Sequence, residues 1–257
     1  MVTEPGPPSD VPAPPERIPS PTAPPLPHRP VTFHRQRDVV LLHWRVDPAL
    51  VADLVPGGCT PDLHDGSAWV ALTGYVFADS TVPPLPPLGR LGTMTEVTVE
   101  ILTVDADGRQ GIAYRSIDTQ HLPAIAAARL GIGLPYTYAR AGSRRYGPQI
   151  AHRTRRPGGA GEGAAGASAR LRVRASGPAS PSDPLVAFLT RRWGVHAHHL
   201  GRTSWWRLEH EPWVLERADV LELDETLLAA AGLGMLAGTP PDSVLCSTGA
   251  DVRYSRG

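Results

Sequence analysis

Lysine is absent from this sequence: all 25 residues counted as Lys or Arg are arginines. Arginine binds anions through its planar guanidinium group but stays protonated, so it does not serve as an amine nucleophile. Iminium catalysis needs a primary amine whose pKa has been lowered. The sequence therefore excludes a Schiff-base mechanism on a lysine side chain.

Net charge is also absent, because 25 acidic residues balance the 25 arginines. A neutral chain has no long-range field that draws it to nucleic acid or to an anionic membrane. Glycine-rich nucleotide-binding motifs are missing as well, and nothing in the sequence requires a cofactor. We expect a small-molecule ligand as the partner, and association of identical copies stays open.

Cysteine is scarce, with Cys59 and Cys246 far apart in the sequence and in no metal-binding or disulfide pattern. Such usage is typical of a reducing compartment. No apolar run reaches the roughly 18 residues of a membrane span, and the first residues lack the apolar core of a secretory signal. We expect a cytoplasmic protein.

Proline, serine, threonine and alanine dominate residues 1–30. A segment of this composition buries too little apolar surface to offset the entropy lost on ordering. We expect a disordered proline-rich tail over 1–30 and a single domain over 31–257, since a chain of this length rarely supports two cores.

Short strands with a few helices between them make up the domain. The clearest hairpin runs from 94–104 through an Ala-Asp-Gly turn to 110–119. Further strands are predicted over 38–46, 67–77, 138–153, 169–175, 196–208, 213–223 and 244–254, and helices over 48–54, 121–130, 183–193 and 225–232. This order indicates an α+β fold on a mostly antiparallel, curved sheet.

Several groups of polar residues resemble sites without matching a specific motif. Three histidines, His196, His198 and His199, followed by Glu209, His210 and Glu211, are candidate metal ligands, but no spaced Cys/His or HExxH motif accompanies them, so we predict no metal. Ser116, Asp118 and His121 suggest a nucleophilic triad, yet no strained elbow frames the serine. Trp205 and Trp206 are more typical of a pocket wall than of base stacking at zero net charge.

Several stretches in a fixed order resemble the YqjF-like family of uncharacterised bacterial proteins: HWRVDPALVADLVPGG, DGSAWVALTGYVF, GIGLPYTYAR, HEPW and GADVRY. The resemblance spans about residues 33–254. It implies the acetoacetate-decarboxylase-like fold, in which a curved sheet closes into a cone-like β-barrel with a few peripheral helices around a deep, mostly apolar cavity.

The more distant resemblance to the decarboxylases suggests site residues. Met94-Thr95-Glu96 is similar to their Tyr-Thr-Glu, which makes Glu96 the candidate acid or base. Arg37, or Arg35 if the gap falls differently, matches their ligand-binding arginine. Their lysine pair falls on Tyr136-Thr137 here, and their second pocket glutamate falls near Ala71, so both are lost.

Each candidate has an alternative role. Glu96 shares one strand face with Thr98 and Glu100, and that face is either the pocket or the solvent side. Tyr136 is a catalytic hydrogen-bond donor or a core aromatic.

The arginines and the threonine are candidates for ligand binding. Arg37 is a carboxylate clamp or a surface residue. Arg115 is a ligand-binding residue or an ion-pair partner of Glu96, and Thr137, beside Tyr136, completes the candidate ligand-binding residues.

Two functions follow. In the first, the protein is an enzyme without a Schiff base that enolises, dehydrates or cyclises a carbonyl or carboxylate compound by acid-base catalysis with Glu96 and Tyr136. In the second, the same cavity belongs to a non-catalytic ligand-binding or sensor module. The two differ in whether Glu96 reaches a proton of the bound ligand.

Overall fold

The computed structural model of the protein describes residues 18–84, 86, 89–158 and 164–257. Residues 1–17 of the expected tail lie outside the described residues. The remainder, 18–30, lies against the domain: Trp193 Nε1 donates a hydrogen bond to the Ser20 carbonyl (2.9 Å), and Arg207 donates one to the Pro24 carbonyl (3.0 Å). The boundary at 30/31 stays a prediction.

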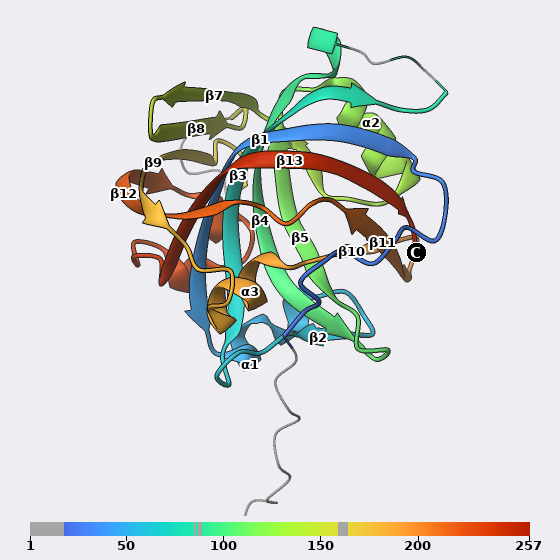
Figure 1. Cartoon of the computed structure of the whole chain (residues 1–257), viewed down its shortest axis with the longest axis horizontal. Coiled ribbons are helices and arrows are strands. Elements are labelled where there is room, and N and C mark those ends of the chain that lie inside the picture. Colours follow the sequence, from blue (N-terminus) through green and yellow to red (C-terminus); the bar gives the residue numbers. More distant parts are fainter. Residues whose placement is uncertain (1–17, 85, 87–88, 159–163) are drawn as a thin grey trace, which may run out of the picture.

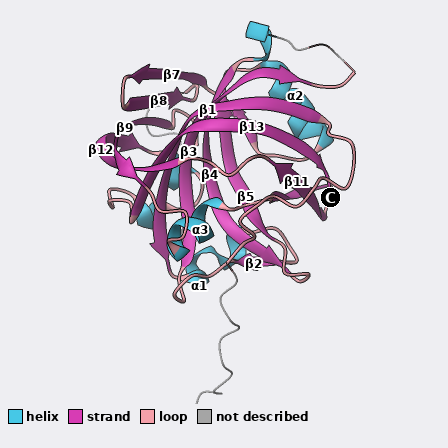
Figure 2. Ribbon diagram, viewed as in Figure 1, coloured by secondary structure: helices cyan, strands magenta, loops and turns pink. Residues whose placement is uncertain are grey.

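Strands dominate the fold (Figure 2). In the described part of the chain a single sheet contains β1 Thr32–Val46, β2 Cys59–Pro61, β3 Ala68–Thr81, β4 Met94–Asp105, β5 Gln110–Thr119, β6 Tyr136–Tyr138, β7 Arg140–Tyr146, β8 Gln149–Arg155, β9 Ser168–Pro178, β10 Gly194–His199, β11 Arg202–Glu209, β12 Leu215–Glu225 and β13 Ser243–Arg256. The helices are short: α1 Pro48–Val51, α2 Leu122–Gly131, α3 Pro184–Thr190 and α4 Leu227–Ala230, with 3₁₀ turns at Ala52–Leu54, Gly89–Gly92 and Gly234–Leu236. The α+β expectation is confirmed.

The strand pairing returns to its starting point. The sheet order runs β1-β3-β4-β5-β10-β11-β13, and β13 pairs with β1 in antiparallel register from Thr32↔Tyr254 to His43↔Ser243. We call these seven strands the strand circuit. Figure 1 shows β1 and β13 running side by side as long curved arrows. The pairing is antiparallel except for the contact of β5 with β10 and that of β5 with β6.

A second layer covers one side of the circuit. Strands β7, β8, β9 and β12 pair in turn, and they lie beside β1 and β3 at the left of Figure 1. The alternation of β4 explains the packing, because Val97, Val99 and Ile101 point outward into one buried cluster with Ile150 of β8 and Val173 of β9. The other face of β4 therefore points into the circuit.

Two segments that were each predicted as one strand form two strands in the structure. The segment predicted as one strand over 138–153 turns at Gly147 to give β7 and β8, and the segment 196–208 turns at Leu200 and Gly201, both with positive φ, to give β10 and β11. The predicted helix 48–54 is one α-helical turn followed by a 3₁₀ turn. Its expected cap is present, since Asp47 accepts a hydrogen bond from the Ala49 amide (2.9 Å).

Within the described residues, none of the helices has both the length and the apolar character needed to cross a membrane. The longest, α2, has ten residues. Both cysteines, Cys59 and Cys246, are unpaired thiols.

Candidate functional site

A cavity of about 510 Å³, here called the outer cavity, lies within the strand circuit beneath α2. All seven circuit strands contribute side chains to it. Most lining groups are apolar, and the polar exceptions include one carboxyl group and four tyrosines. The lining includes Phe77, Met94, Ile117, Ala124, Ala128, Leu134, Val195 and Trp206, with Glu96, Tyr75, Tyr114, Tyr136 and Tyr254.

Glu96 lies at the wall of the outer cavity and is fully buried. Its Oε2 accepts a hydrogen bond from Tyr75 (2.8 Å), and its Oε1 accepts one from Tyr136 (2.9 Å). Burial raises the pKa of Glu96 to about 7; the two hydroxyls work against this rise, and the charge of nearby Glu100 adds to it. The carboxyl group is therefore able to take up or release a proton near neutral pH.

Tyr136 reaches Glu96 through parallel pairing. Strand β6 lies beside β5 with Tyr136 opposite Ile117, and the tyrosine side chain is buried. Burial raises the pKa of Tyr136 well above its usual value, and the neighbouring Glu96 raises it further. Tyr136 thus stays a neutral hydrogen-bond donor across the physiological pH range.

Three tyrosines of the site were not among the predicted residues. Tyr75 lies opposite Glu96 in the β3–β4 register, Tyr114 comes from β5, and Tyr254 from β13. The signal that would have found Tyr75 is strand alternation: if Glu96 faces inward, its cross-strand partner does too. No comparable local signal marks Tyr254, which lies at the other end of the chain.

The structure does not place Arg37 in the cavity. Arg37 is exposed, and the residue that faces inward from this part of β1 is Gln36, which is 7% exposed. The pairing of β1 with β3 is irregular just after this point, with a register shift between Arg37 and Val40. Arg35 also points outward, and it pairs with Asp79 and Asp251. Arg35 and Arg37 flank the inward-facing Gln36 on β1, so both side chains face away from the interior of the strand circuit. Neither arginine contacts Glu96.

Arg115 also lies away from Glu96. Its Nη1 donates to the Leu54 carbonyl (2.9 Å) and its Nε to the Ala231 carbonyl (3.3 Å), so it connects the 3₁₀ turn after α1 to the end of α4. Thr137 follows Tyr136 in β6, opposite Asp118, and is not part of the cavity lining. The structure therefore brings Glu96 and Tyr136 together and leaves Arg37, Arg115 and Thr137 outside the outer cavity.

A smaller chamber of about 50 Å³, here called the inner chamber, lies further along the same strands. Tyr75, Tyr114 and Tyr254 line both spaces. Glu100, two inward positions beyond Glu96 on β4, lines the inner chamber and accepts a hydrogen bond from Thr98. Burial raises the pKa of Glu100 to about 7, while hydrogen bonds from Thr98 and Thr73 act in the opposite direction.

The other predicted polar groups are separated in space. His196 is buried between Thr103 (2.9 Å) and Asp105 (3.3 Å), and in the described ranges no cluster of three or more His, Cys, Asp or Glu residues is suited to a metal ion. Asp118 forms a buried ion pair with Arg156 (2.8 Å). His121 caps α2 by accepting from the Ala124 amide.

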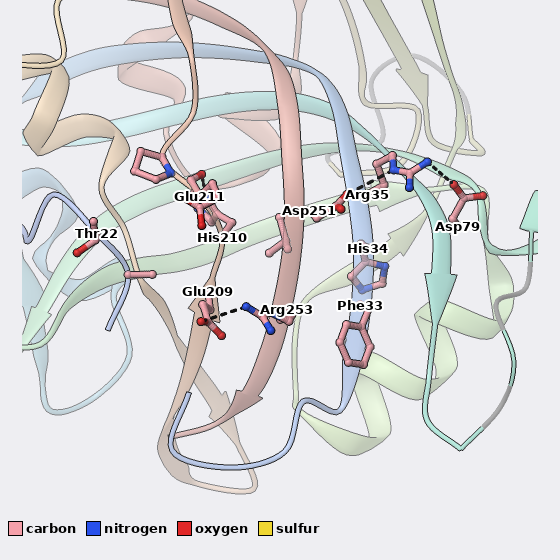
Figure 3. A pocket seen from close by; sticks show the side chains of 13 residues that line it. Thr22, Phe33, His34, Arg35, Asp79, Glu209, His210, Glu211, Asp251 and Arg253 are labelled. Atoms are coloured by element: carbon pink, nitrogen blue, oxygen red, sulfur yellow. Dashed lines mark hydrogen bonds and ion pairs between the residues drawn. The ribbon is translucent and has the colours of Figure 1, made fainter. Parts of the chain in front are cut away.

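A surface hollow of about 560 Å³ lies beside β1 and β13 (Figure 3). Five of its charged groups pair with one another: Arg35 with Asp79 (3.1 Å) and Asp251 (3.4 Å), and Arg253 with Glu209 (3.2 Å). These pairs are solvent-exposed, and none of the carboxyl groups that line the hollow is buried as Glu96 is in the outer cavity.

Comparisons with known proteins give a similar sequence and solved structures of similar fold. The chain is 26% identical over 203 residues to the uncharacterized protein YqjF of Bacillus subtilis, covering 79% of this chain and 82% of that one. An acetoacetate decarboxylase from Legionella pneumophila superposes with a TM-score of 0.62 at 16% identity, over 96% of this chain and 91% of that one. The enduracididine biosynthesis enzyme MppR, complexed with a condensation product of pyruvate and imidazole 4-carboxaldehyde, superposes with a TM-score of 0.57 at 13% identity, over 90% and 89%.

The two structural likenesses are too distant in sequence to show more than the fold, which is acetoacetate-decarboxylase-like. Residues 34–251 match the family DUF2071, described as an uncharacterized conserved protein. This range runs from within β1 into β13 and includes Glu96 and three of the four tyrosines that line the outer cavity, Tyr75, Tyr114 and Tyr136. The chain therefore belongs to the DUF2071 family.

Proposed function

We propose that this protein binds a small, largely apolar carbonyl compound in the outer cavity and that Glu96 exchanges a proton with it. The observation that carries the proposal is the position of Glu96: a fully buried carboxyl group at the wall of a mostly apolar cavity, held by two tyrosine hydroxyls. The strand circuit, in this proposal, forms a cone-like barrel around that cavity.

The proposed chemistry is enolisation. The Glu96 carboxylate takes a proton from the carbon next to the ligand carbonyl, the C–H electron pair forms a carbon–carbon double bond, and the carbonyl electrons move to oxygen. Tyr114 and Tyr254 line the same cavity and are available to donate a hydrogen bond to the resulting enolate oxygen. Dehydration or cyclisation of a suitable substrate would begin with the same proton transfer.

A lysine iminium has no part in this mechanism. The sequence contains no lysine, and Tyr136 stands where the resemblance places the decarboxylases' lysine. A phenol of raised pKa does not form an iminium but does orient the neighbouring carboxylate. The pyruvate-derived ligand of MppR supports a carbonyl compound as the ligand class on this fold. The two unpaired cysteines support a location in the reducing cytoplasm.

The test is deuterium uptake from heavy water into 2-alkanones and 2-oxo acids of graded chain length, followed by proton NMR. We expect the wild type to accelerate exchange next to the carbonyl and Glu96→Gln to lose at least about 100-fold of that acceleration. Glu211→Gln is the matched control, because Glu211 is exposed and does not line the outer cavity. Saturable ligand binding without exchange would contradict the proposed proton transfer. It would favour the non-catalytic binding module, which the apolar lining supports equally well.

A further inference from the structure

The outer cavity gathers aromatic side chains from distant parts of the chain. The described residues that line it make up less than a tenth of the sequence. Yet of the 15 phenylalanine, tryptophan and tyrosine residues in the chain, six line this one cavity, and they come from the five strands β3, β5, β6, β11 and β13: Tyr75, Phe77, Tyr114, Tyr136, Trp206 and Tyr254. The cavity is therefore strongly enriched in rings.

Three of these rings are only half-buried, so a ligand in the cavity is able to reach them: Tyr114, Trp206 and Tyr254. Trp206 lies opposite Arg256 in the pairing of β11 with β13, and Tyr254 lies opposite Leu208. The two aromatic residues are thus diagonal neighbours on one face of the sheet, a separation that large side chains span. They form a continuous aromatic wall.

Helix α2 gives the cavity a wall of a different kind. Its two leucines face solvent, Leu122 being 62% and Leu130 79% exposed, and Ile125 is its one buried residue. A helix that only covers a core directs its large apolar side chains inward. Here a row of small residues at helical spacing lines the cavity instead: Ala124, Ala127, Ala128 and Gly131. This side of the cavity is therefore flat and left unfilled by the protein.

The volume of the outer cavity fits a compound of two fused rings. About 510 Å³ gives room for roughly 17 non-hydrogen atoms, if each takes about 30 Å³, the share of one water molecule in the liquid. A molecule the size of pyruvate would fill only about a third of this space. A bicyclic ketone fills most of it.

We propose that the ligand of the outer cavity is an aromatic carbonyl compound whose ring system lies between α2 and the rings of Tyr114, Trp206 and Tyr254. This inference rests on the proposed function, because it assigns a substrate class to the same cavity. Aromatic rings attract one another through their negative faces and positive edges, and each pair strengthens binding by about twofold to tenfold beyond the effect of the buried area.

Two ketones with the same carbon skeleton test the aromatic requirement: 2-acetylnaphthalene and its saturated counterpart, 2-acetyldecahydronaphthalene. The full chain, with its alanine methyl groups ¹³C-labelled, is titrated with each ketone and followed by NMR. The signals of Ala126 and Ala128 are assigned with Ala126→Gly and Ala128→Gly.

We expect the aromatic ketone to bind at least tenfold more tightly than the saturated one. Its ring current should shift the methyl signal of Ala128, while the signal of Ala126, which is exposed and does not line the cavity, stays in place. Equal or tighter binding of the saturated ketone, or no saturable shift with either compound, overturns the proposal.

Trp206→Leu removes one ring of the aromatic wall and keeps an apolar side chain. We expect the aromatic ketone to bind at least about fivefold more weakly to this variant, and the saturated ketone to keep its affinity within about twofold, which also shows that the cavity is intact. Trp205→Leu is the matched control, because the Trp205 ring lies against His196 (4.6 Å between ring centroids) and does not line the outer cavity. An unchanged affinity for the aromatic ketone in Trp206→Leu, or an equal loss for both ketones, would contradict recognition of the ring.

The same ketones separate this inference from the proposed proton transfer. Tight binding of 2-acetylnaphthalene without deuterium uptake at its methyl group would support the aromatic site and contradict Glu96 as the base. Deuterium uptake into 2-alkanones, with no preference for the aromatic ketone, would support the proton transfer and contradict the aromatic site.

Discussion

The hydroxyl of Tyr136 donates a 2.9 Å hydrogen bond to the carboxyl group of Glu96, although the two residues are 40 positions apart in the sequence and lie on different strands. Strand β5 lies between them in the sheet: Glu96 is on β4, and Tyr136 is on β6, which pairs with the far edge of β5. This contact gives the one carboxyl group that lines the outer cavity a neutral hydrogen-bond donor, which favours the charged form of Glu96.

The stability of the protein should fall as the pH rises, in part because of Glu96. Its pKa is about 7 in the folded state against 4.5 ordinarily, so the folded state keeps a proton that the unfolded state has lost. The resulting stability is complete below about pH 4.5 and is lost as the pH rises through about 7. Glu96→Gln removes this dependence and should stabilise the fold at pH 8 by up to about 3 kcal/mol relative to pH 5. Thermal unfolding of the wild type and of Glu96→Gln from pH 5 to 8 measures this effect. A stability difference between the two proteins that does not change with pH would refute the raised pKa.

Tyr136→Phe should raise the pKa of Glu96 further, since it removes a hydrogen bond that favours the carboxylate. The pH midpoint of deuterium exchange should therefore move upward, and the rate at pH 7 should fall by about tenfold. Tyr138→Phe, an exposed tyrosine on the same strand, is the control and should leave both unchanged. A downward shift of the midpoint would show that Tyr136 does not stabilise the charged form.

Filling the outer cavity should abolish ligand binding and leave the fold intact. Ala128 on α2 lines the cavity, so Ala128→Phe places a ring in the space that the ligand would occupy. Ala126→Phe adds the same ring on an exposed position of the same helix. We expect at least tenfold weaker binding of 2-alkanones to the first variant alone, measured by ligand-observed NMR. Equal affinity in both variants would place the ligand elsewhere.

The buried ion pair between Asp118 and Arg156 should be needed for stability. Asp118→Asn leaves the guanidinium of Arg156, itself 7% exposed, without its charged partner. Breaking a buried pair on one side costs about 3–5 kcal/mol. Denaturant unfolding at pH 7 measures the loss, and a cost below about 1 kcal/mol would mean that water or another group replaces the carboxylate.

Local patterns predicted the local parts of the fold. The β4–β5 hairpin agrees with its predicted bounds to within one residue, because its alternation and its Asp107-Gly108 turn are both encoded in adjacent residues. The long strands predicted over 138–153 and 196–208 were wrong, because short turns such as Leu200-Gly201 interrupt a pattern that otherwise reads as continuous. The pairing of β1 with β13 joins the two ends of the domain, and no local pattern predicts it.

The site was predictable only in part for the same reason. Glu96 and Tyr136 came from the family resemblance, and the structure places them in contact. The choice of Arg37 depended on facing direction in β1, where the inward residue is Gln36, one position earlier. Tyr254 and the polar residues that line the inner chamber come from distant segments, and the strand circuit brings them together.

The pH dependence of deuterium exchange by the wild type tests the central claim most directly. If Glu96 is the base, the exchange rate above the solvent background should rise as the carboxyl group ionises, with a midpoint near pH 7, and then level off. A midpoint near 4.5, or a profile that Glu96→Gln leaves unchanged, would contradict the assignment of Glu96 as the proton-exchanging group.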